Sequence, residues 1–324
     1  MAKAEMMLNS LIKFLKTWTL PIAMTMGALG YIIYDACQLP DALRLTCSRA
    51  VEIVQPALLF AMMFLSSCKL SPKDLRWRPW HFKLLAVQLL AFVLLALASM
   101  RYSDHDCAVV LQAAMLCMIC PTATASPVIT AKLGGSTASI TSYLILVNLC
   151  VAIVVPIFLP LVNPTAGIGF FSAFLSILLK VFPLLLLPLI LAWLVRAYCP
   201  RLLQKILKQS DLAFYLWAIA LALAIAVTTR GLMQSQVAIS LVAGITMVSI
   251  LACALQFYLG KKIGAPHDDK IAAGQSLGQK NTVFIIWLGY TFLDPVTSLA
   301  GGLYSIWHNF YNSYQLYRQS KNRA

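Results

Sequence analysis

Charged residues are scarce in this sequence. Asp, Glu, Lys and Arg make up 11% of its 324 residues, whereas hydrophobic residues make up 60% and the mean hydropathy is +0.81. A soluble globular protein carries about 25% charged residues, so this composition excludes an ordinary soluble domain. A nucleotide-binding motif is also missing, which argues against a pump driven by ATP.

Groups for chemistry are equally scarce. Only 11 residues are acidic, and the apolar segments contain no pair of carboxylates, no His/Asp constellation and no cluster of cysteines. General acid–base and metal chemistry need such groups, so we expect no enzyme, cofactor or metal. A membrane-embedded enzyme stays the less favoured alternative. The segment RYSDHDC (101–107) contains metal-binding residue types, but a solvated loop is the favoured interpretation.

Long apolar runs recur along the whole chain. Runs of about 18 or more apolar residues predict transmembrane helices. The ten candidates are residues 18–36, 51–67, 82–100, 107–132, 136–162, 169–195, 211–229, 234–260, 268–292 and 295–316. The predicted fold class is therefore all-α, a polytopic membrane protein with ten transmembrane helices.

Basic residues are distributed unevenly around these spans. With the N-terminus inside, 19 of the 25 basic residues fall in inner segments. The outer loops hold only Arg44, Arg49, Arg101 and Arg230. The positive-inside rule predicts this asymmetry, so the net charge of +14 reflects topology rather than a nucleic-acid-binding surface. We expect an integral protein of a bacterial inner membrane with both termini in the cytoplasm.

Two features lie at the ends of the first span. Residues 1–17 predict a short interfacial helix, because their apolar residues share one face and their lysines lie elsewhere. Cys37 and Cys47 both fall on the expected outer side. A disulfide between them is possible there, although two separate thiols are the favoured interpretation.

Span four should be interrupted. Its segment CPTATASPVITAKLGG (120–135) contains Pro121 and Pro127, each of which lacks an N–H group and clashes with the preceding helical turn. We expect the helix to break near Ala123–Pro127 and to resume at Val128.

Span nine is interrupted in the same way by GQSLGQKN (274–281), which contains Lys280. Asp269 and Asp294 would lie about 15–20 Å from this lysine along a helix, so Lys280 falls near the middle of the membrane. An ionisable residue there is functional by default, and snorkelling to an interface is the disfavoured alternative. Interrupted helices at matching positions of two five-helix halves predict a transporter's binding site, and the odd number makes the repeat inverted.

Four fragments, taken together, resemble segments of the bile acid:sodium symporter family. They are PALLFAMMFLSSCKLSPKDL (56–75), CPTATASPVITAKLGG (120–135), LGQKNT (277–282) and SLAGGLYSIWHNFYNS (298–313). The resemblance implies a 5+5 inverted repeat over residues 18–163 and 169–318, with helices 4 and 9 broken and crossing. It also implies a core domain from spans 3–5 and 8–10, and a panel domain from spans 1–2 and 6–7.

The function that the resemblance implies is alternating-access transport of small organic anions, bile-acid-like or pantoate-like. Auxin-efflux-carrier-like transporters share the architecture and are the nearest alternative. The expected partners are the organic anion and the lipid bilayer, without nucleic acid or an obligate protein partner.

The sodium sites that the resemblance implies are altered in this chain. The family's Ser-Asn pair reads Ser126 and Pro127, and its Glu and Gln positions in span nine read Ser276 and Lys280. A sodium ion requires hard oxygen ligands, whereas an ammonium group supplies none and repels it. We therefore expect transport without sodium coupling, with Lys280 in place of a sodium ion. This lysine is either permanently charged or exchanges its proton.

The candidate site residues fall into two sets. The substrate-binding set is Thr124, Ser126, Pro127, Thr130, Lys280, Asn281 and Thr282. The ion-site set is Gln88, Ser126, Ser139, Thr141, Ser276, Gln279 and Lys280. The anion is expected between the half-helix N-termini after Pro127 and Asn281, with free N–H groups on Val128, Ile129 and Thr130.

Three residues outside these sets carry open alternatives. Lys180 either faces the substrate cleft or snorkels to the outer surface. Asp294, before Pro295, is expected to be a turn residue rather than a coupling group. His308 is expected to be a packing residue rather than a ligand.

Overall fold

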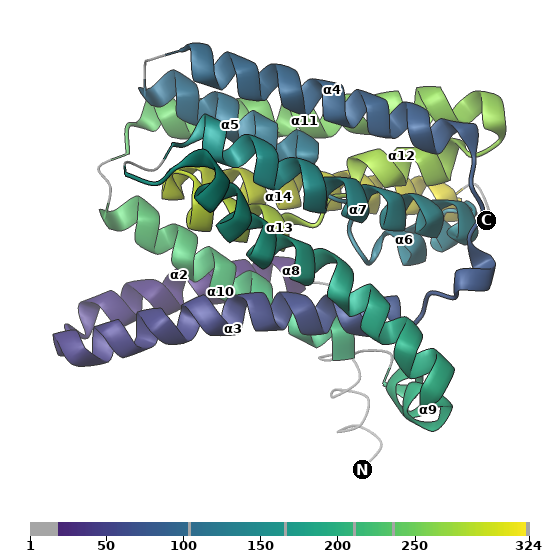
Figure 1. Cartoon of the computed structure of the whole chain (residues 1–324), viewed down its shortest axis with the longest axis horizontal. Helices are drawn as coiled ribbons and strands as arrows, with labels where there is room; N and C mark the ends of the chain where they lie inside the picture. The colour runs from purple at the N-terminus through teal and green to yellow at the C-terminus, as the bar shows by residue number, and fades with distance from the viewer. Residues whose placement is uncertain (1–18, 103–104, 165–166, 210–211, 235–236, 322–324) are drawn as a thin grey trace.

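The chain folds into a bundle of helices, most of which run along the horizontal axis of Figure 1. The computed structural model describes residues 19–102, 105–164, 167–209, 212–234 and 237–321. These ranges contain helices and one isolated β-bridge but no strand. The interfacial helix predicted over residues 1–17 lies outside them.

Within the described ranges, five helices are long and apolar enough to cross a membrane. They are α3 (Asp41–Ser67), α4 (Pro79–Arg101), α7 (Thr137–Val162), α8 (Phe170–Tyr198) and α11 (Ile239–Gly264). The prediction of an all-α fold is confirmed for the described residues, and the five apolar helices agree with a polytopic membrane protein. Further helices are α2 (Thr19–Ala36), α9 (Pro200–Lys208), α10 (Leu212–Gln234) and α14 (Leu299–Lys321).

Two of the predicted spans are each divided into two helices. Residues 107–132 correspond to α5 (His105–Ile119) and α6 (Ser126–Lys132), and residues 268–292 to α12 (Lys270–Gly278) and α13 (Thr282–Phe292). A short 3₁₀ helix, η3 (Pro295–Ser298), connects α13 to α14.

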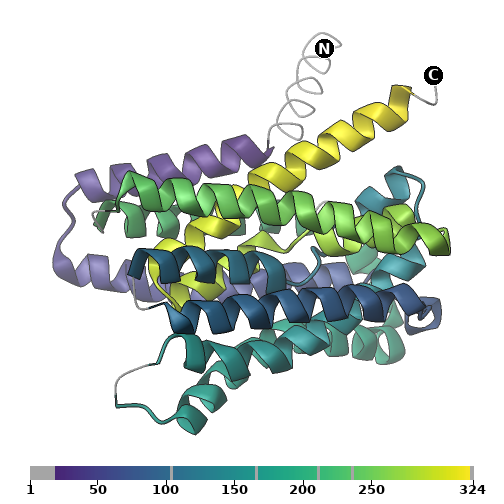
Figure 2. The same ribbon diagram turned by 90° about the horizontal axis from the view of Figure 1, so that it is seen from above.

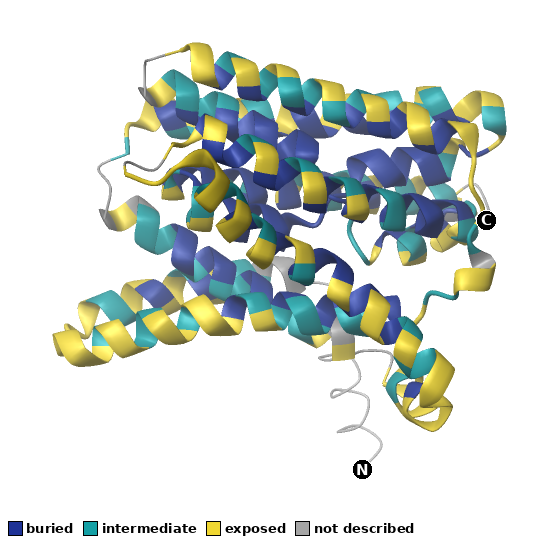
Figure 3. Cartoon of the chain, in the orientation of Figure 1, coloured by how far each residue is buried: buried dark blue, intermediate teal, exposed yellow. Residues whose placement is uncertain are grey.

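The helices pack in two groups. In Figure 1, α2, α3 and α10 lie together below, whereas α4, α5, α11 and α12 lie above, and α8 packs on both α3 and α7. Small residues allow close approach: Gly260 and Gly264, one turn apart on α11, face the backbone and Cβ of Ala273 on α12. Figure 3 shows that buried residues gather in the middle of the bundle, while the N-terminal end of α3 is largely exposed.

Two predicted boundaries are wrong. Helix α3 begins at Asp41 rather than at residue 51, so Arg44 and Arg49 are helical. Arg230 belongs to α10 rather than to an outer loop. Apolar runs mark only the lipid-facing part of a helix, whereas Ala, Leu and Arg have high helix propensity and extend α3 into the charged segment.

Candidate functional site

The two helix breaks meet in the interior. An antiparallel bridge joins Thr122 of the first break to Lys280 of the second. Two hydrogen bonds flank this bridge, from the Ala123 N–H to the Gln279 carbonyl at 2.8 Å and from the Asn281 N–H to the Pro121 carbonyl at 3.0 Å. Backbone groups that the interrupted helices leave unpaired are therefore satisfied by the opposite break.

The first break ends earlier than predicted. Helix α6 resumes at Ser126, with Pro127 in its first turn, where a missing N–H group is tolerated. As a result, the N–H groups of Val128 and Ile129 both donate to the carbonyl of Ala125, at 3.1 and 3.4 Å. The prediction that these two groups are free to face an anion is wrong.

Two backbone N–H groups at the start of α13 are also hydrogen-bonded. Asn281 is its N-cap residue, and its backbone and side-chain oxygens accept from the Phe284 N–H at 3.1 and 3.4 Å. The Ile285 N–H donates to the same backbone carbonyl at 3.3 Å. An anion at the crossing would thus depend on side chains rather than on these N–H groups.

Lys280 is buried at the end of α5. Only 1% of its surface is exposed, so its ammonium group does not reach an interface. Its Nζ donates to the carbonyl of Met118, in the last turn of α5, at 3.3 Å. Among the described residues no carboxylate forms an ion pair with it. The amino group therefore faces helix C-terminal carbonyls, which lack intrahelical partners and carry partial negative charge.

A glutamine and a tyrosine hold the end of α5. The Nε2 of Gln88 donates to the carbonyls of Ile119 and Cys120 at 2.9 and 3.1 Å. Its Oε1 accepts from the hydroxyl of Tyr143 at 3.0 Å. Gln88 was predicted as an ion-site residue, but Tyr143 was not predicted from the sequence.

A second such pair, Gln256 and Tyr304, was missed altogether. The Nε2 of Gln256 donates to the carbonyl of Cys117 at 3.2 Å and to the Tyr304 hydroxyl at 3.0 Å. That hydroxyl donates to the carbonyl of Gly278, the last residue of α12, at 2.8 Å. The available signal was a glutamine within an apolar span, in the third and again in the eighth predicted span.

Several polar atoms near the breaks are buried without a hydrogen-bond partner in the protein. They are Thr130 Oγ1, Ser276 Oγ, Gln279 Oε1 and Asn281 Nδ2. Burial of such groups is unfavourable unless water or a ligand pairs with them. Ser126, by contrast, donates to the carbonyl of Ala123 at 2.6 Å, and the half-buried Thr124 and the buried Thr282 complete the predicted substrate set.

Another predicted ion-site residue has a different partner. Ser139 donates to Oδ2 of the buried Asp269 at 3.1 Å. The same oxygen accepts from Trp80 Nε1 at 3.0 Å and lies 3.8 Å from Nε of Arg78. Thr141 is buried in the same helix. Because Ser139 donates directly to the carboxylate, this cluster lacks the Ser–His–Asp arrangement of a hydrolase.

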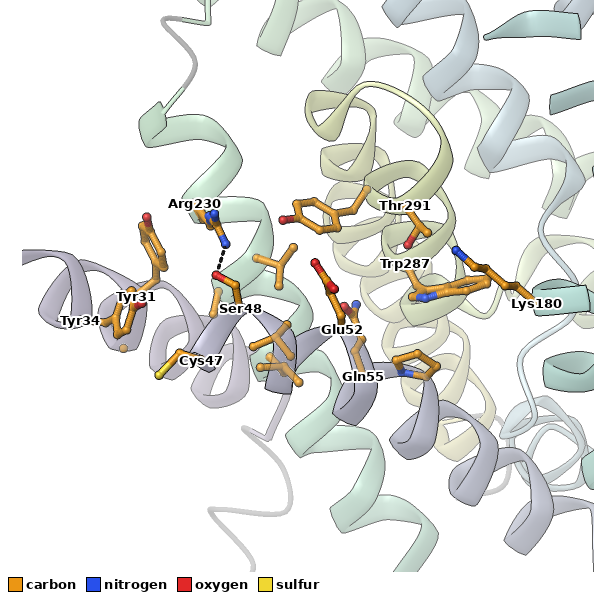
Figure 4. A pocket seen from close by; sticks show the side chains of 17 residues that line it. Tyr31, Tyr34, Cys47, Ser48, Glu52, Gln55, Lys180, Arg230, Trp287 and Thr291 are labelled. Carbon is orange, nitrogen blue, oxygen red and sulfur yellow. Dashed lines mark hydrogen bonds between the residues drawn. The ribbon is translucent and has the colours of Figure 1, made fainter. Parts of the chain in front are cut away.

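A cavity of about 730 Å³ lies between α2, α3, α8, α10 and α13. Its volume is within the usual range of about 300–1,000 Å³ for small-molecule sites. Figure 4 shows its polar lining, which includes Glu52, Lys180 and Arg230. Nη1 of Arg230 donates to Ser48 Oγ at 2.8 Å, and Lys180 Nζ lies 5.5 Å from the centre of the Phe292 ring. Lys180 therefore belongs to the lining of this cavity. Arg230 was not predicted as a site residue, because it was assigned to a loop from the sequence.

The remaining expectations concern single residues. Asp294 Oδ1 accepts from the Val296 N–H at 2.8 Å, as in a turn. His308 is 5% exposed and packs edge-on against Tyr304. Cys37 and Cys47 are free thiols. The RYSDHDC segment falls partly outside the described ranges, within which no cluster of metal-ligating residues occurs.

Comparison with protein-family models and with curated proteins finds no match for this sequence. The resemblance to bile acid:sodium symporters thus stays a prediction.

Proposed function

We propose that this protein is a secondary transporter of small organic anions that works by alternating access without sodium coupling. The observation that carries the proposal is the pair of bridged helix breaks with Lys280 buried between them. Broken helices that meet in a membrane protein's interior are typical of transporter binding sites.

The two Gln/Tyr pairs support a 5+5 inverted repeat over ten spans. Gln88 and Tyr143 belong to α4 and α7, the proposed third and fifth spans. Gln256 and Tyr304 belong to α11 and α14, the proposed eighth and tenth spans. Each pair thus occupies corresponding spans of its half and contacts the end of a broken helix.

The packing supports a division into two domains. Helices α2, α3, α8 and α10 form the proposed panel, and the broken helices with α4, α7, α11 and α14 form the core. The cavity of Figure 4 lies where α13 of the core faces the panel. Relative movement of the two groups would open or close this cavity, as alternating access requires.

The cavity suits an organic anion with an apolar body. Lys180 and Arg230 supply positive charge, and Trp287 and Tyr290 supply aromatic surface. Glu52, in the same lining, disfavours ligands of high negative charge. The unpaired side-chain atoms at the breaks are the groups that the substrate or water would meet as the core moves.

The absence of sodium coupling follows from electrostatics. Two like charges about 4 Å apart repel by about 4 kcal/mol at an effective dielectric constant near 20, close to a thousandfold in affinity. A charged Lys280 would therefore exclude sodium from its surroundings. Uncoupled and proton-linked transport both agree with this, and the pH dependence of flux distinguishes them.

The proposed location is an inner membrane, with both termini in the cytoplasm. Cysteines introduced at residue 3 and in the 71–80 loop should react with impermeant thiol reagents only from the cytoplasmic side. Labelling of both positions from the outside would show that the topology is the inverse of the proposed one.

An uptake screen of small organic anions in proteoliposomes tests the function. Wild-type protein should take up at least one anion above the level of protein-free vesicles. Arg230→Gln should raise the KM for that anion by about tenfold, because a lost charged hydrogen bond is worth about 1.5–3 kcal/mol. Arg201→Gln, on α9 and outside the cavity, is the matched control and should behave as wild type. Uptake of none of the anions would contradict the proposed function.

A further inference from the structure

A second cavity, of about 700 Å³, lies between α11 and α14. These two helices lie beside each other in Figure 2. The residues that line this cavity are distinct from those that line the cavity of Figure 4. This groove therefore does not belong to the proposed transport site.

One part of the groove is apolar and open to the surroundings. Ile250, Ala254, Trp307 and Phe310 line it, and Phe310 is 75% exposed. Neighbouring residues of α11 also expose large apolar side chains, for example Leu251 at 59%. In a helical membrane protein such a face lies against lipid tails.

The other end of the groove is basic. Lys261, Lys262 and Lys270 line it, at the end of α11 and the start of α12. No acidic residue is among the described residues that line the groove, and no described carboxylate forms an ion pair with these lysines. The nearby Asp269 is directed elsewhere, since it accepts hydrogen bonds from Trp80 and Ser139. The positive charge of the groove is thus uncompensated.

Lys261 is held in place by neutral groups. Its Nζ donates to the Tyr311 hydroxyl at 2.8 Å and to Gln315 Oε1 at 2.6 Å. It also lies 4.9 Å from the centre of the Tyr311 ring. These contacts orient the ammonium group without neutralising it, as a site for an external anion would require.

We propose that this groove binds an anionic phospholipid. The phosphate group lies against Lys261, Lys262 and Lys270, and an acyl chain lies along Ala254, Trp307 and Phe310. The occupant follows from charge complementarity and from the continuity of the apolar part with the lipid-facing surface. Basic pockets between transmembrane helices recognise anionic headgroups on the same physical basis.

Native mass spectrometry of the full-length protein in detergent tests the proposal. The protein is titrated separately with phosphatidylglycerol, with phosphatidylcholine of the same acyl chains, and with inorganic phosphate. Phosphatidylglycerol should bind at least about tenfold more tightly than phosphatidylcholine, because a lysine beside an anionic lipid contributes about fivefold. Inorganic phosphate should give no comparable adduct, since it lacks the acyl chain.

Three variants locate the site. Lys262→Gln with Lys270→Gln, both exposed positions, should weaken phosphatidylglycerol binding by about 25-fold. Ala254→Trp keeps the charge but fills the apolar part, and should weaken binding of the same lipid. The matched control is Lys205→Gln with Lys208→Gln on α9, which removes the same charge at another basic surface and should change binding less than twofold. Unchanged thermal unfolding without lipid should accompany all three.

Each contrary outcome overturns the proposal. Equal affinity for the two lipids would show that charge is not recognised. Loss of binding in the α9 control to the same extent would show a general surface effect. Binding of phosphate as tight as that of lipid, or full binding by Ala254→Trp, would show an anion site without an acyl groove.

Discussion

The two helix breaks differ in how they form and agree in how they are held. Residues 120–125 separate α5 from α6 and contain a proline, with a second proline in the first turn beyond. Residues 279–281 separate α12 from α13 without a proline and contribute the buried Lys280. At the end of α5, Gln88 donates to two backbone carbonyls and accepts from Tyr143. At the end of α12, Tyr304 donates to one backbone carbonyl and accepts from Gln256. The buried lysine therefore distinguishes the second break from the first more clearly than the supporting contacts do.

The supporting pairs also differ in which member makes more bonds. At the end of α5, Gln88 makes three hydrogen bonds and Tyr143 makes one of them. At the end of α12, Tyr304 both accepts from Gln256 and donates to a carbonyl. Gln256 also makes two hydrogen bonds, to the Cys117 carbonyl and to Tyr304. The glutamine is thus central in the first pair, whereas the two members of the second pair contribute equally.

Removal of the cation should have the largest effect. Lys280→Met should reduce anion flux by at least about a hundredfold, because the crossing of the two breaks would lose the cation proposed to replace sodium there, and a charge interaction at about 4 Å is worth about 4 kcal/mol. Thermal stability should stay equal or rise, because a buried ammonium group is costly to desolvate. Flux in proteoliposomes and the unfolding temperature of the purified protein measure the two effects.

Lys132→Met is the matched control. It removes the exposed lysine at the end of α6, beside the first break, and should leave flux within twofold of wild type. Lys280→Met with normal flux and a lower unfolding temperature would make Lys280 a structural residue.

Restoring sodium ligands should make the second break respond to sodium. Ser276→Glu combined with Lys280→Gln supplies a carboxylate and an amide oxygen and removes the repelling charge. Sodium at about 100 times its Kd should then stabilise the double variant by about 2.7 kcal/mol. Wild type and Lys280→Gln alone should unfold at the same temperature in sodium chloride and in choline chloride. Equal sodium stabilisation of wild type would contradict the account.

Loss of the glutamine should destabilise the protein more in the first pair, whereas loss of the tyrosine should destabilise it more in the second pair. Gln88→Leu should destabilise more than Gln256→Leu, whereas Tyr304→Phe should destabilise more than Tyr143→Phe. An unpaired buried group costs about 1–3 kcal/mol. Gln88 makes three hydrogen bonds and Gln256 two, whereas Tyr304 makes two and Tyr143 one. Unfolding temperatures of the four variants under one set of conditions suffice. If both variants of one pair destabilised the protein more than both variants of the other pair, the number of hydrogen bonds would not determine the effect.

The smallest effects are expected from hydroxyl groups of the first break. Thr130→Val removes a buried, unpaired hydroxyl and should leave stability unchanged or slightly higher while weakening substrate binding. Ser126→Ala removes a hydrogen bond to the carbonyl of Ala123 and should cost about 1 kcal/mol in stability. Substrate affinity and unfolding temperature, measured on both variants, separate the two roles. Unchanged affinity in both would place the substrate elsewhere.

Much of the fold was accessible from sequence because its signals are local. Apolar runs located the long helices, and Pro121 together with the polar segment before Asn281 located both breaks. The early start of α6 was missed, because proline disfavours a helix interior but is tolerated in a first turn. Because α6 starts early, the N–H groups of Val128 and Ile129 are hydrogen-bonded within its first turn.

The supporting and cavity residues depend on contacts between distant parts of the chain. Gln256 donates a hydrogen bond to Cys117, and Arg230 donates one to Ser48, over sequence separations of 139 and 182 residues. A sequence shows that a polar residue interrupts an apolar span, but not towards which helix it points. Lys280 was found because it lies in a polar segment within an apolar span, whereas Gln256 lies within an apolar run and Tyr304 in a fragment whose sequence does not show its partner.

Sodium replacement tests the central claim most directly. Flux of the transported anion is measured in proteoliposomes at fixed pH, first with sodium and then with choline in its place. We expect equal flux in the two conditions, because the proposed role of Lys280 is to take the place of a sodium ion. A collapse of wild-type flux in choline would contradict the assignment of Lys280 as the built-in cation.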